Sequence, residues 1–189
     1  MTKVVGILAL QGSFIEHQNK LKGSILIKVA SQLSEIDALV IPGESVLTLG
    51  GESTVIYQLL DSLDFIHPLL EFAKSNVIYG TCAGLIILQK LGLLNISVQR
   101  NGYGSQKFSF VADVYINEKI NVSRKCIPGY FIRAPRISSI ESNVEVVATR
   151  EMEIVAVRQG NILASCFHPE LDQGSSPFYE ILMEMLEKL

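Results

Sequence analysis

The stretch "VIYGTCAGLIIL", residues 77–88, carries the clearest information on the fold. A short apolar run ends in Gly-Thr-Cys-Ala-Gly, and a second apolar run follows at once. The first run is typical of a buried strand, and the second, which begins at Ala83, is typical of a buried helix. A strand that passes into a helix through so tight a turn is the unit from which α/β sheets are built.

The same alternation continues on both sides of this unit. Further strands are expected at residues 3–10, 25–29, 38–41 and 161–167. Further helices are expected to start at Ser13 and Ser53, and to lie at 68–74 and 177–189. This alternation predicts an α/β fold of three layers, in which a mostly parallel central sheet has helices on both faces.

The second half of the chain has a different pattern. Strand-like segments follow one another with tight links, at 108–116, 129–134, 144–150 and 153–160. Strands joined so closely pair antiparallel, so we expect a small antiparallel patch beside the parallel sheet. No internal repeat or linker interrupts the chain, and residues 1–189 are expected to form a single domain.

The composition argues against several classes of protein. Of the 189 residues, 48% are hydrophobic and 19% are charged, which is typical of a globular chain. The net charge of -3 gives no electrostatic reason to expect a nucleic acid or an anionic membrane as partner. No apolar run approaches the roughly 20 residues that span a bilayer, and the first run is too short for a signal peptide.

The cysteines and histidines favour neither a disulfide framework nor a metal site. Three cysteines without close pairing point to a reducing compartment, so we expect a cytoplasmic protein. The Cys and His residues do not have the spacing of metal ligands, and "LGGEST" (49–54) lacks the lysine of a phosphate-binding loop. We therefore expect neither a metal nor a cofactor.

Cys82 lies between two glycines at the expected strand–helix junction, in "GTCAG". This is the pattern of a nucleophile elbow, in which a tight bend presents the nucleophile and glycines let other backbone approach. The positive end of the following helix favours the reactive thiolate, and the first amide groups of that helix can face an oxyanion. Cys126 and Cys166 lack such a setting and are expected only to pack.

A thiolate nucleophile needs a base and a group that orients the base. His168 and Glu170 follow an apolar run in "FHPEL", and in extended backbone their side chains point to the same side. The strands that precede Cys82 and His168 are expected to end at the same edge of the sheet, where ligands bind. The pattern predicts a Cys-His-Glu triad, whereas His17 and His67 are interpreted as structural.

Several segments together resemble the class I, triad-type glutamine amidotransferases, which have a flavodoxin-like fold. The first is Cys82 in "GTCAGLIIL" with His168 and Glu170 in "FHPEL". Further blocks resemble the glutaminase subunits of pyridoxal 5'-phosphate synthase complexes, namely "GILALQG" (6–12), "GGEST" (50–54), "RNGYGSQ" (100–106) and "FIRAP" (131–135). The blocks occur in the family's order, so the resemblance covers nearly the whole chain.

The resemblance implies an activity, a partner and a role for each matching residue. Cys82 would attack the side-chain carboxamide of L-glutamine, and His168, oriented by Glu170, would pass the thiol proton to the leaving ammonia. The substrate would be bound by Gly51, Glu52, Ser53, Arg100, Ile132 and Arg133. The oxyanion would be held by Gly51, Ala83 and Gln11, the last when the partner docks. Ammonia would then pass to a barrel-shaped synthase subunit for vitamin B6 synthesis.

The chain departs from the family pattern in three places. The loop usually written Pro-Gly-Gly-Glu-Ser is interrupted here by extra residues at 44–50, in "PGESVLTLGGEST". The connection after the nucleophile helix, "LQKLGLLN", is shorter than usual. Ser105 stands where the family usually has Arg, and the acidic residue common after Ser-Phe is missing from "KFSF". These changes bear on the oxyanion loop and the partner contacts.

Two alternatives to a glutaminase subunit of vitamin B6 synthesis stay open on the sequence. One is an amidotransferase subunit that serves another acceptor, such as one of histidine biosynthesis, although "FIRAP" and "RNGYGSQ" count against it. The other is a non-catalytic subunit that binds the synthase, with an oxyanion loop spoiled by the insertion. Trapping of Cys82 by a glutamine-like electrophile would separate an enzyme from an inert subunit.

Overall fold

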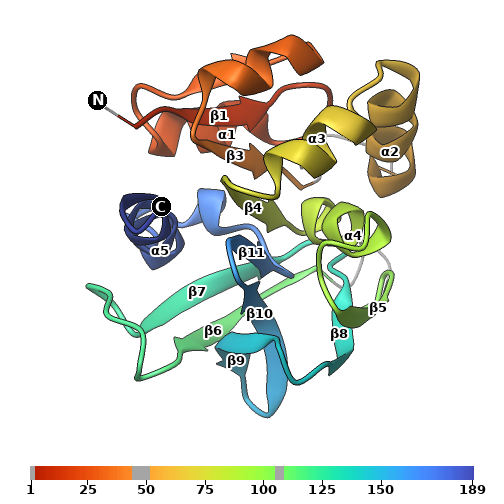
Figure 1. Cartoon of the computed structure of the whole chain (residues 1–189). Coiled ribbons are helices and arrows are strands. Elements are labelled where there is room, and N and C mark those ends of the chain that lie inside the picture. The colour runs from red at the N-terminus through yellow and green to blue at the C-terminus, as the bar shows by residue number, and fades with distance from the viewer. Residues whose placement is uncertain (1–2, 44–51, 105–108) are drawn as a thin grey trace.

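The computed structural model describes residues 3–43, 52–104 and 109–189, and in these residues a nine-stranded sheet is the main feature (Figure 1). The strand order is β2-β1-β3-β4-β11-β10-β9-β6-β7. The parallel part consists of β2 (Ile25–Ile27), β1 (Val5–Leu8), β3 (Ala38–Ile41), β4 (Val77–Thr81) and β11 (Ile162–Ser165). The antiparallel part continues it through β10 (Glu153–Gln159), β9 (Glu145–Arg150), β6 (Phe110–Ile116) and β7 (Cys126–Phe131).

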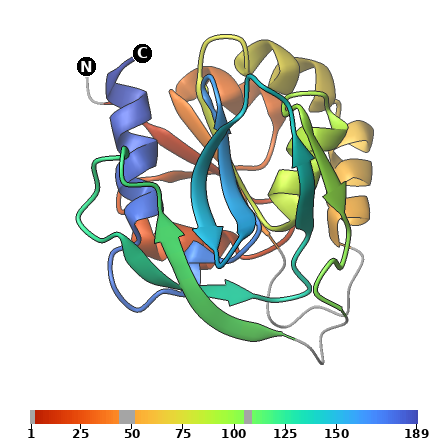
Figure 2. The ribbon, with the colours of Figure 1, turned by 90° about the horizontal axis from the view of Figure 1, so that it is seen from below.

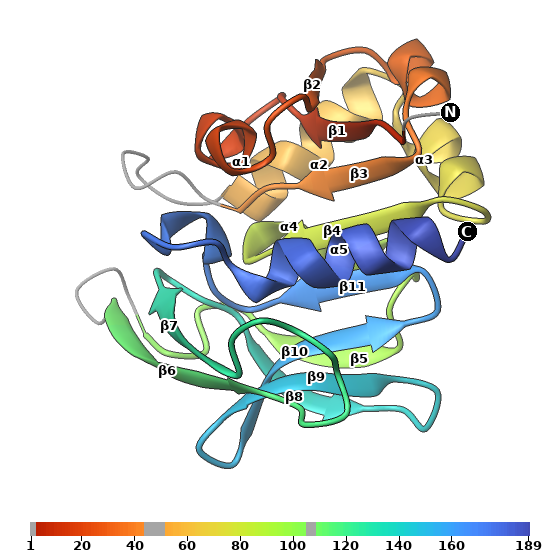
Figure 3. The ribbon, with the colours of Figure 1, turned by 90° about the vertical axis from the view of Figure 1, so that its left-hand side faces the viewer.

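Helices cover both faces of the parallel part (Figure 3). One face carries α1 (Phe14–Lys20) and α5 (Pro177–Glu187). The other face carries α2 (Glu52–Ser62), α3 (Ile66–Phe72) and α4 (Ala83–Lys90). Two short 3-10 helices, η1 (Ala30–Glu35) and η3 (Pro169–Leu171), follow β2 and β11. The predicted three-layer α/β fold is therefore confirmed.

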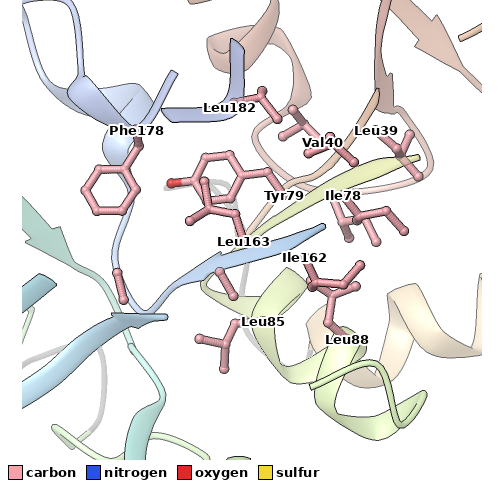
Figure 4. Packing of buried hydrophobic residues seen from close by; sticks show 14 of the residues in the cluster. Leu39, Val40, Ile78, Tyr79, Leu85, Leu88, Ile162, Leu163, Phe178 and Leu182 are labelled. Carbon is pink, nitrogen blue, oxygen red and sulfur yellow. The ribbon is translucent and has the colours of Figure 1, made fainter. Parts of the chain in front are cut away.

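The core explains why the central strands read as continuous apolar runs. Alternate residues of a strand point to opposite faces, and both faces are covered here. Leu39, Ile78 and Ile162 are register partners on one face, and they pack toward Leu85 and Leu88 of α4 (Figure 4). On the other face Val40, Tyr79 and Leu163 pack toward Phe178 and Leu182 of α5. All of these residues are buried.

The expected elements are found with small shifts of their ends. β3 covers the expected residues 38–41, whereas the expected strand at 129–134 lies earlier, at Cys126–Phe131. Two strands were not expected, β5 (Ile96–Gln99) and β8 (Arg136–Ile140), which pair with each other on the α4 side of the molecule (Figure 2). Their sequences, "ISVQ" and "RISSI", are too short and polar to indicate strands by themselves. The two segments are strands because they pair with each other.

The parallel strands bring their carboxyl ends to one edge of the sheet, where α/β proteins bind ligands. The segments that leave this edge are Gln11–Ser13 after β1, Pro42–Gly43 after β3, Cys82 after β4 and Cys166–Glu170 after β11. Within the parts of the chain that the structure describes, no helix is both long and apolar enough to cross a membrane.

Candidate active site

Cys82 occupies a strained backbone turn between β4 and α4. Its φ of 48° and ψ of -103° lie outside the regions that residues with side chains usually adopt. Neighbouring glycines permit this turn. A Cβ on Gly80 would lie 2.8 Å from Gly84, and a Cβ on Gly84 would lie 2.1 Å from the carbonyl oxygen of Ile41. The backbone therefore has the sharp bend of a nucleophile elbow, and the Cys82 side chain is nearly buried.

His168 and Glu170 form a buried pair at the end of β11. Nδ1 of His168 lies 2.7 Å from Oε1 of Glu170. The pairing was expected from extended backbone, but Pro169–Leu171 forms the 3-10 turn η3, and this turn brings the two side chains together. The backbone N–H of His168 donates to the carbonyl of Tyr130 at 3.0 Å, which anchors the turn on β7.

Gly43 leaves room for Cys82 and His168 to approach each other. A Cβ on Gly43 would lie 2.6 Å from Cβ of Cys82 and 2.9 Å from Cε1 of His168. Both side chains therefore lie against the same point of the backbone, directly after β3. Nε2 of His168 is buried and has no hydrogen-bond partner among the described residues. Because Glu170 takes Nδ1, this second nitrogen is the one left for the thiol.

The charges at the site favour an ionised Glu170 and a protonated His168. Burial raises the pKa of Glu170, but the neighbouring His17 and His168, together with the hydrogen bonds from His168 and Ser13, outweigh it and lower that pKa to about 2. Burial lowers the pKa of His168, yet the charges of Glu170 and Cys82 raise it well above its usual value. The imidazole is thus suited to accept and hold a proton from the thiol.

Of the substrate residues named above, the structure places Ile132 in contact with Cys82, and it brings Arg100 to the start of α2. The carbonyl of Ile132, just after β7, accepts from Sγ of Cys82 at 3.7 Å. Arg133, next along the chain, has a φ of 46° and is half-buried. Arg100, after β5, donates to Oγ1 of Thr54 at 3.1 Å, so its guanidinium reaches the first turn of α2 beside the buried Ser53.

The residues named for the oxyanion are placed only in part. Ala83 is the first residue of α4, where backbone N–H groups have no partner within the helix. Gln11 is half-buried in the turn after β1. Gly51 and the extra residues at 44–50 lie outside the described residues, as does the side chain of Glu52.

Four further residues, which the sequence did not single out for this site, contact Glu170 directly or through His17. Ser13, where a helix was expected to start, is the N-cap residue of α1, but its hydroxyl donates to Oε1 of Glu170 at 2.6 Å and not to the helix. His17, interpreted as structural, lies with Nε2 3.4 Å from Oε2 of Glu170. Thr81 Oγ1 lies 3.2 Å from the same nitrogen, and the Tyr179 hydroxyl lies 2.9 Å from His17 Nδ1. The four-residue spacing of Ser13 and His17 is the one signal that could have shown them on a common helix face.

The remaining cysteines and the third histidine lie away from this arrangement or are inert. Cys166 is fully buried, and burial raises the pKa of its thiol, so it stays neutral. Cys126 was expected to pack but is exposed on β7, and His67 is exposed on α3. In the described ranges no three His, Cys, Asp or Glu side chains are grouped so that they could hold a metal ion.

The chain matches the SNO glutamine amidotransferase family over residues 7–188. It is 42% identical to a pyridoxal 5'-phosphate synthase subunit PdxT of Oenococcus oeni, with 100% of this chain and 99% of that protein covered. It is 44% identical to the subunit of the same name from Anoxybacillus flavithermus, with 88% of each chain covered.

Solved structures agree with these sequence matches. A crystal structure of a glutamine amidotransferase superposes with a TM-score of 0.85 at 33% identity, covering 97% of this chain and 98% of that one. PurLQS of Thermotoga maritima superposes with a TM-score of 0.72 at 17% identity, covering 100% of this chain and 99% of that one, a likeness in fold alone.

Proposed function

We propose that Cys82, His168 and Glu170 perform the glutamine hydrolysis of this chain. The chain belongs to the SNO glutamine amidotransferase family and hydrolyses glutamine as a subunit of a pyridoxal 5'-phosphate synthase. The observation that carries the proposal is the His168 ring itself. Its Nδ1 lies 2.7 Å from Glu170, and its Cε1 and the Cβ of Cys82 both lie against Gly43. An acid–base group held between a thiol and a carboxylate is what thiol-dependent hydrolysis requires.

The reaction follows in two halves. His168 takes the proton of Cys82, and the thiolate attacks the carbonyl carbon of the glutamine side chain. The tetrahedral intermediate collapses when His168 returns the proton to the leaving nitrogen, so ammonia departs and a thioester remains. His168 then removes a proton from water, the water attacks the thioester, and glutamate leaves as the proton returns to the Cys82 sulfur. Glu170 holds the imidazolium in place in both halves.

Substrate binding is assigned to the residues around the thiol. Arg100 and Arg133 carry the guanidinium groups that suit the α-carboxylate of glutamine. The backbone of Ile132 and the Gly51–Ser53 segment complete the glutamine site. The amides of Gly51 and Ala83, with Gln11, would hold the oxyanion as its charge develops.

The ammonia has a synthase subunit as its acceptor, and we assign that partner to the barrel-shaped type. The relatives named above are themselves synthase subunits, which supports a hetero-oligomer. The whole chain, residues 1–189, acts as one glutamine amidotransferase domain, and the family match over 7–188 supports this. A cytoplasmic location fits the free cysteines, none of which is paired among the described residues.

The test is release of glutamate and ammonia from L-glutamine by the chain mixed with a pyridoxal 5'-phosphate synthase subunit. Cys82→Ala should lower kcat by at least about a thousandfold, because no other group can form the thioester. Cys126→Ala is the matched control, since it removes an exposed thiol on β7 and should leave kcat unchanged. A glutamine-like electrophile should label Cys82 in the wild-type chain. Equal turnover by Cys82→Ala and the wild type would refute the assignment.

A further inference from the structure

The mechanism above leaves one buried histidine without a role. His17 lies on α1 with its side chain fully buried against the triad carboxylate. Glu170 uses Oε1 for both His168 and Ser13, at 2.7 and 2.6 Å. Its second oxygen, Oε2, has no hydrogen bond within the described part of the chain, and the polar atom that faces it is Nε2 of His17 at 3.4 Å. The position of Oε2, and with it the orientation of the carboxylate, therefore depends on His17.

Tyr179 decides which nitrogen of His17 carries the proton. Its hydroxyl lies 2.9 Å from Nδ1 of His17, and burial raises the pKa of Tyr179, so the phenol stays protonated and can donate. Nδ1 then accepts, and the ring proton must lie on Nε2, between Oγ1 of Thr81 at 3.2 Å and Oε2 of Glu170. A bare lone pair at Nε2 would instead face the carboxylate and repel it.

Building on the function proposed above, we propose that His17 is a positioning residue of the triad. Its Nε2–H, set by the Tyr179 hydroxyl, restrains the second oxygen of Glu170 and so keeps the first oxygen aimed at Nδ1 of His168. The chain of contacts runs from α5 through α1 to η3, three elements that meet beneath the end of β4. His17 acts through Glu170 and touches neither the substrate nor the thiol.

This role requires His17 to be neutral. The groups that face it are Glu170 from η3, Tyr179 from α5, Thr81 from β4, His168 beyond the carboxylate, and Glu16 on its own helix. Burial lowers the pKa of His17, and His168 adds to this, while Glu170 and Glu16 oppose it. A neutral donor orients the carboxylate without competing with the imidazolium of His168 for its charge. A charged His17 would take part of that attraction away.

The experiment compares His17→Leu, His17→Gln and Tyr179→Phe with the wild-type chain, each mixed with the synthase subunit. Leu removes the donor at similar volume, whereas Gln places an amide N–H near the former Nε2. His17→Leu should lower kcat for glutamine about tenfold to a hundredfold and change KM by less than about threefold. His17→Gln should restore most of kcat, and Tyr179→Phe should fall between the two.

A second measurement follows the reactivity of the Cys82 thiol in the absence of glutamine. The rate of alkylation of Cys82 by iodoacetamide is followed against pH, with the Cys82 peptide quantified by mass spectrometry. Loss of the His17 donor should shift the midpoint of this profile to higher pH by about one unit, because a less restrained Glu170 stabilises the His168 imidazolium less. Leu182→Ala in α5 is the control, since it removes buried apolar contacts only and should lower Tm without moving the midpoint.

A wild-type kcat and an unmoved midpoint in His17→Leu would overturn the inference, and so would an equal shift in Leu182→Ala. Failure of the proposed function would give a different result from failure of the role proposed for His17. In that case the wild-type chain would release no glutamate, while the alkylation profile would still report whether His17 acts on the pair.

Discussion

At the scale of single residues, Glu170 is the buried charge with which His168, Ser13 and His17 all interact. The carboxylate is fully buried, and burial alone would favour its neutral form. Hydrogen bonds from His168 and Ser13 to one oxygen and the closeness of His17 to the other reverse this preference. The ionised form is therefore a property of the folded chain, and folding and the charge state of Glu170 are linked.

Glu170→Gln tests this linkage through the pH dependence of stability. The folded-state pKa of Glu170 is lowered from 4.5 to about 2, so its contribution is complete above 4.5 and is lost as the pH falls from 4.5 toward 2. At pH 6 the substitution should lower the free energy of unfolding by about 3 kcal/mol, and the gap to the wild type should narrow steadily below pH 4.5. Urea denaturation at several pH values measures both.

Glu71→Gln serves as the surface control for this series. Glu71 is exposed in the last turn of α3 and is paired with Lys74, which follows the helix, so its removal should have little effect on stability at any pH. A gap between Glu170→Gln and the wild type that stayed constant from pH 6 to pH 3 would contradict the assignment of an ionised buried carboxylate.

At the scale of elements, the close approach of α4 to β3 determines where Cys82 lies. Gly84 in the first turn of α4 packs directly on the backbone of Ile41, at the end of β3. The helix can begin this close to the sheet because Gly84 has no side chain. Its first amide groups are thereby held beside the thiol, so the packing of one glycine serves both the core and the elbow.

Gly84→Ala should therefore be strongly destabilising. The added Cβ would lie 2.1 Å from the carbonyl oxygen of Ile41, and backbone on both sides must move to relieve it. We expect a loss of about 3 kcal/mol or more in the free energy of unfolding, together with lower glutaminase activity. Thermal and urea denaturation with activity assays on the same samples measure the two effects.

Gly92→Ala is the comparison that isolates the backbone cost. A Cβ on Gly92 would meet no atom within 4 Å, but its φ is +73°. The substitution should cost about 1 kcal/mol, from the left-handed backbone alone. If Gly84→Ala proved no more costly than Gly92→Ala, the contact between α4 and β3 would not be the reason for this glycine.

At the scale of the whole molecule, backbone contacts connect the turn after β1 to Cys82 and His168. A Cβ on Gly12 would lie 2.1 Å from the carbonyl oxygen of Gly43, and the N–H of Ser13 donates to that oxygen at 3.1 Å. Gly43 in turn lies against both Cys82 and His168. A partner that docks on the turn carrying Gln11 can therefore adjust the site through two backbone contacts.

We accordingly expect the isolated chain to be a poor glutaminase that the synthase subunit activates. The ratio of kcat with and without that subunit should be well above one for the wild type. Gln11→Ala should reduce this ratio, because it removes a residue of the coupled turn. Gln18→Ala, which changes the same residue type on α1 and is also half-buried, should leave the ratio unchanged. A turnover number that does not respond to the added subunit would contradict this expectation.

The sequence by itself determined the class of fold and the pairing of His168 with Glu170. The alternation of apolar runs with helical segments predicts the parallel sheet because strands buried on both faces need apolar residues at every position. The glycines around Cys82 mark the elbow because a sharp turn at the sheet surface leaves no room for side chains. His168 and Glu170 are close in sequence, so their pairing needs only local geometry.

Tertiary structure decided what lies around that pair. Ser13 and His17 lie at α1, Thr81 ends β4 and Tyr179 lies on α5. These are three separate parts of the chain, and only the spacing of Ser13 and His17 gives a local signal that their hydrogen-bonding groups share a partner. The strands β5 and β8 exist because each provides the other's backbone hydrogen bonds, although neither has a strong pattern of its own. The physical reason is the same in both cases. A periodic pattern reports which residues are buried, whereas the partner that satisfies a buried polar group is chosen only when distant segments pack together.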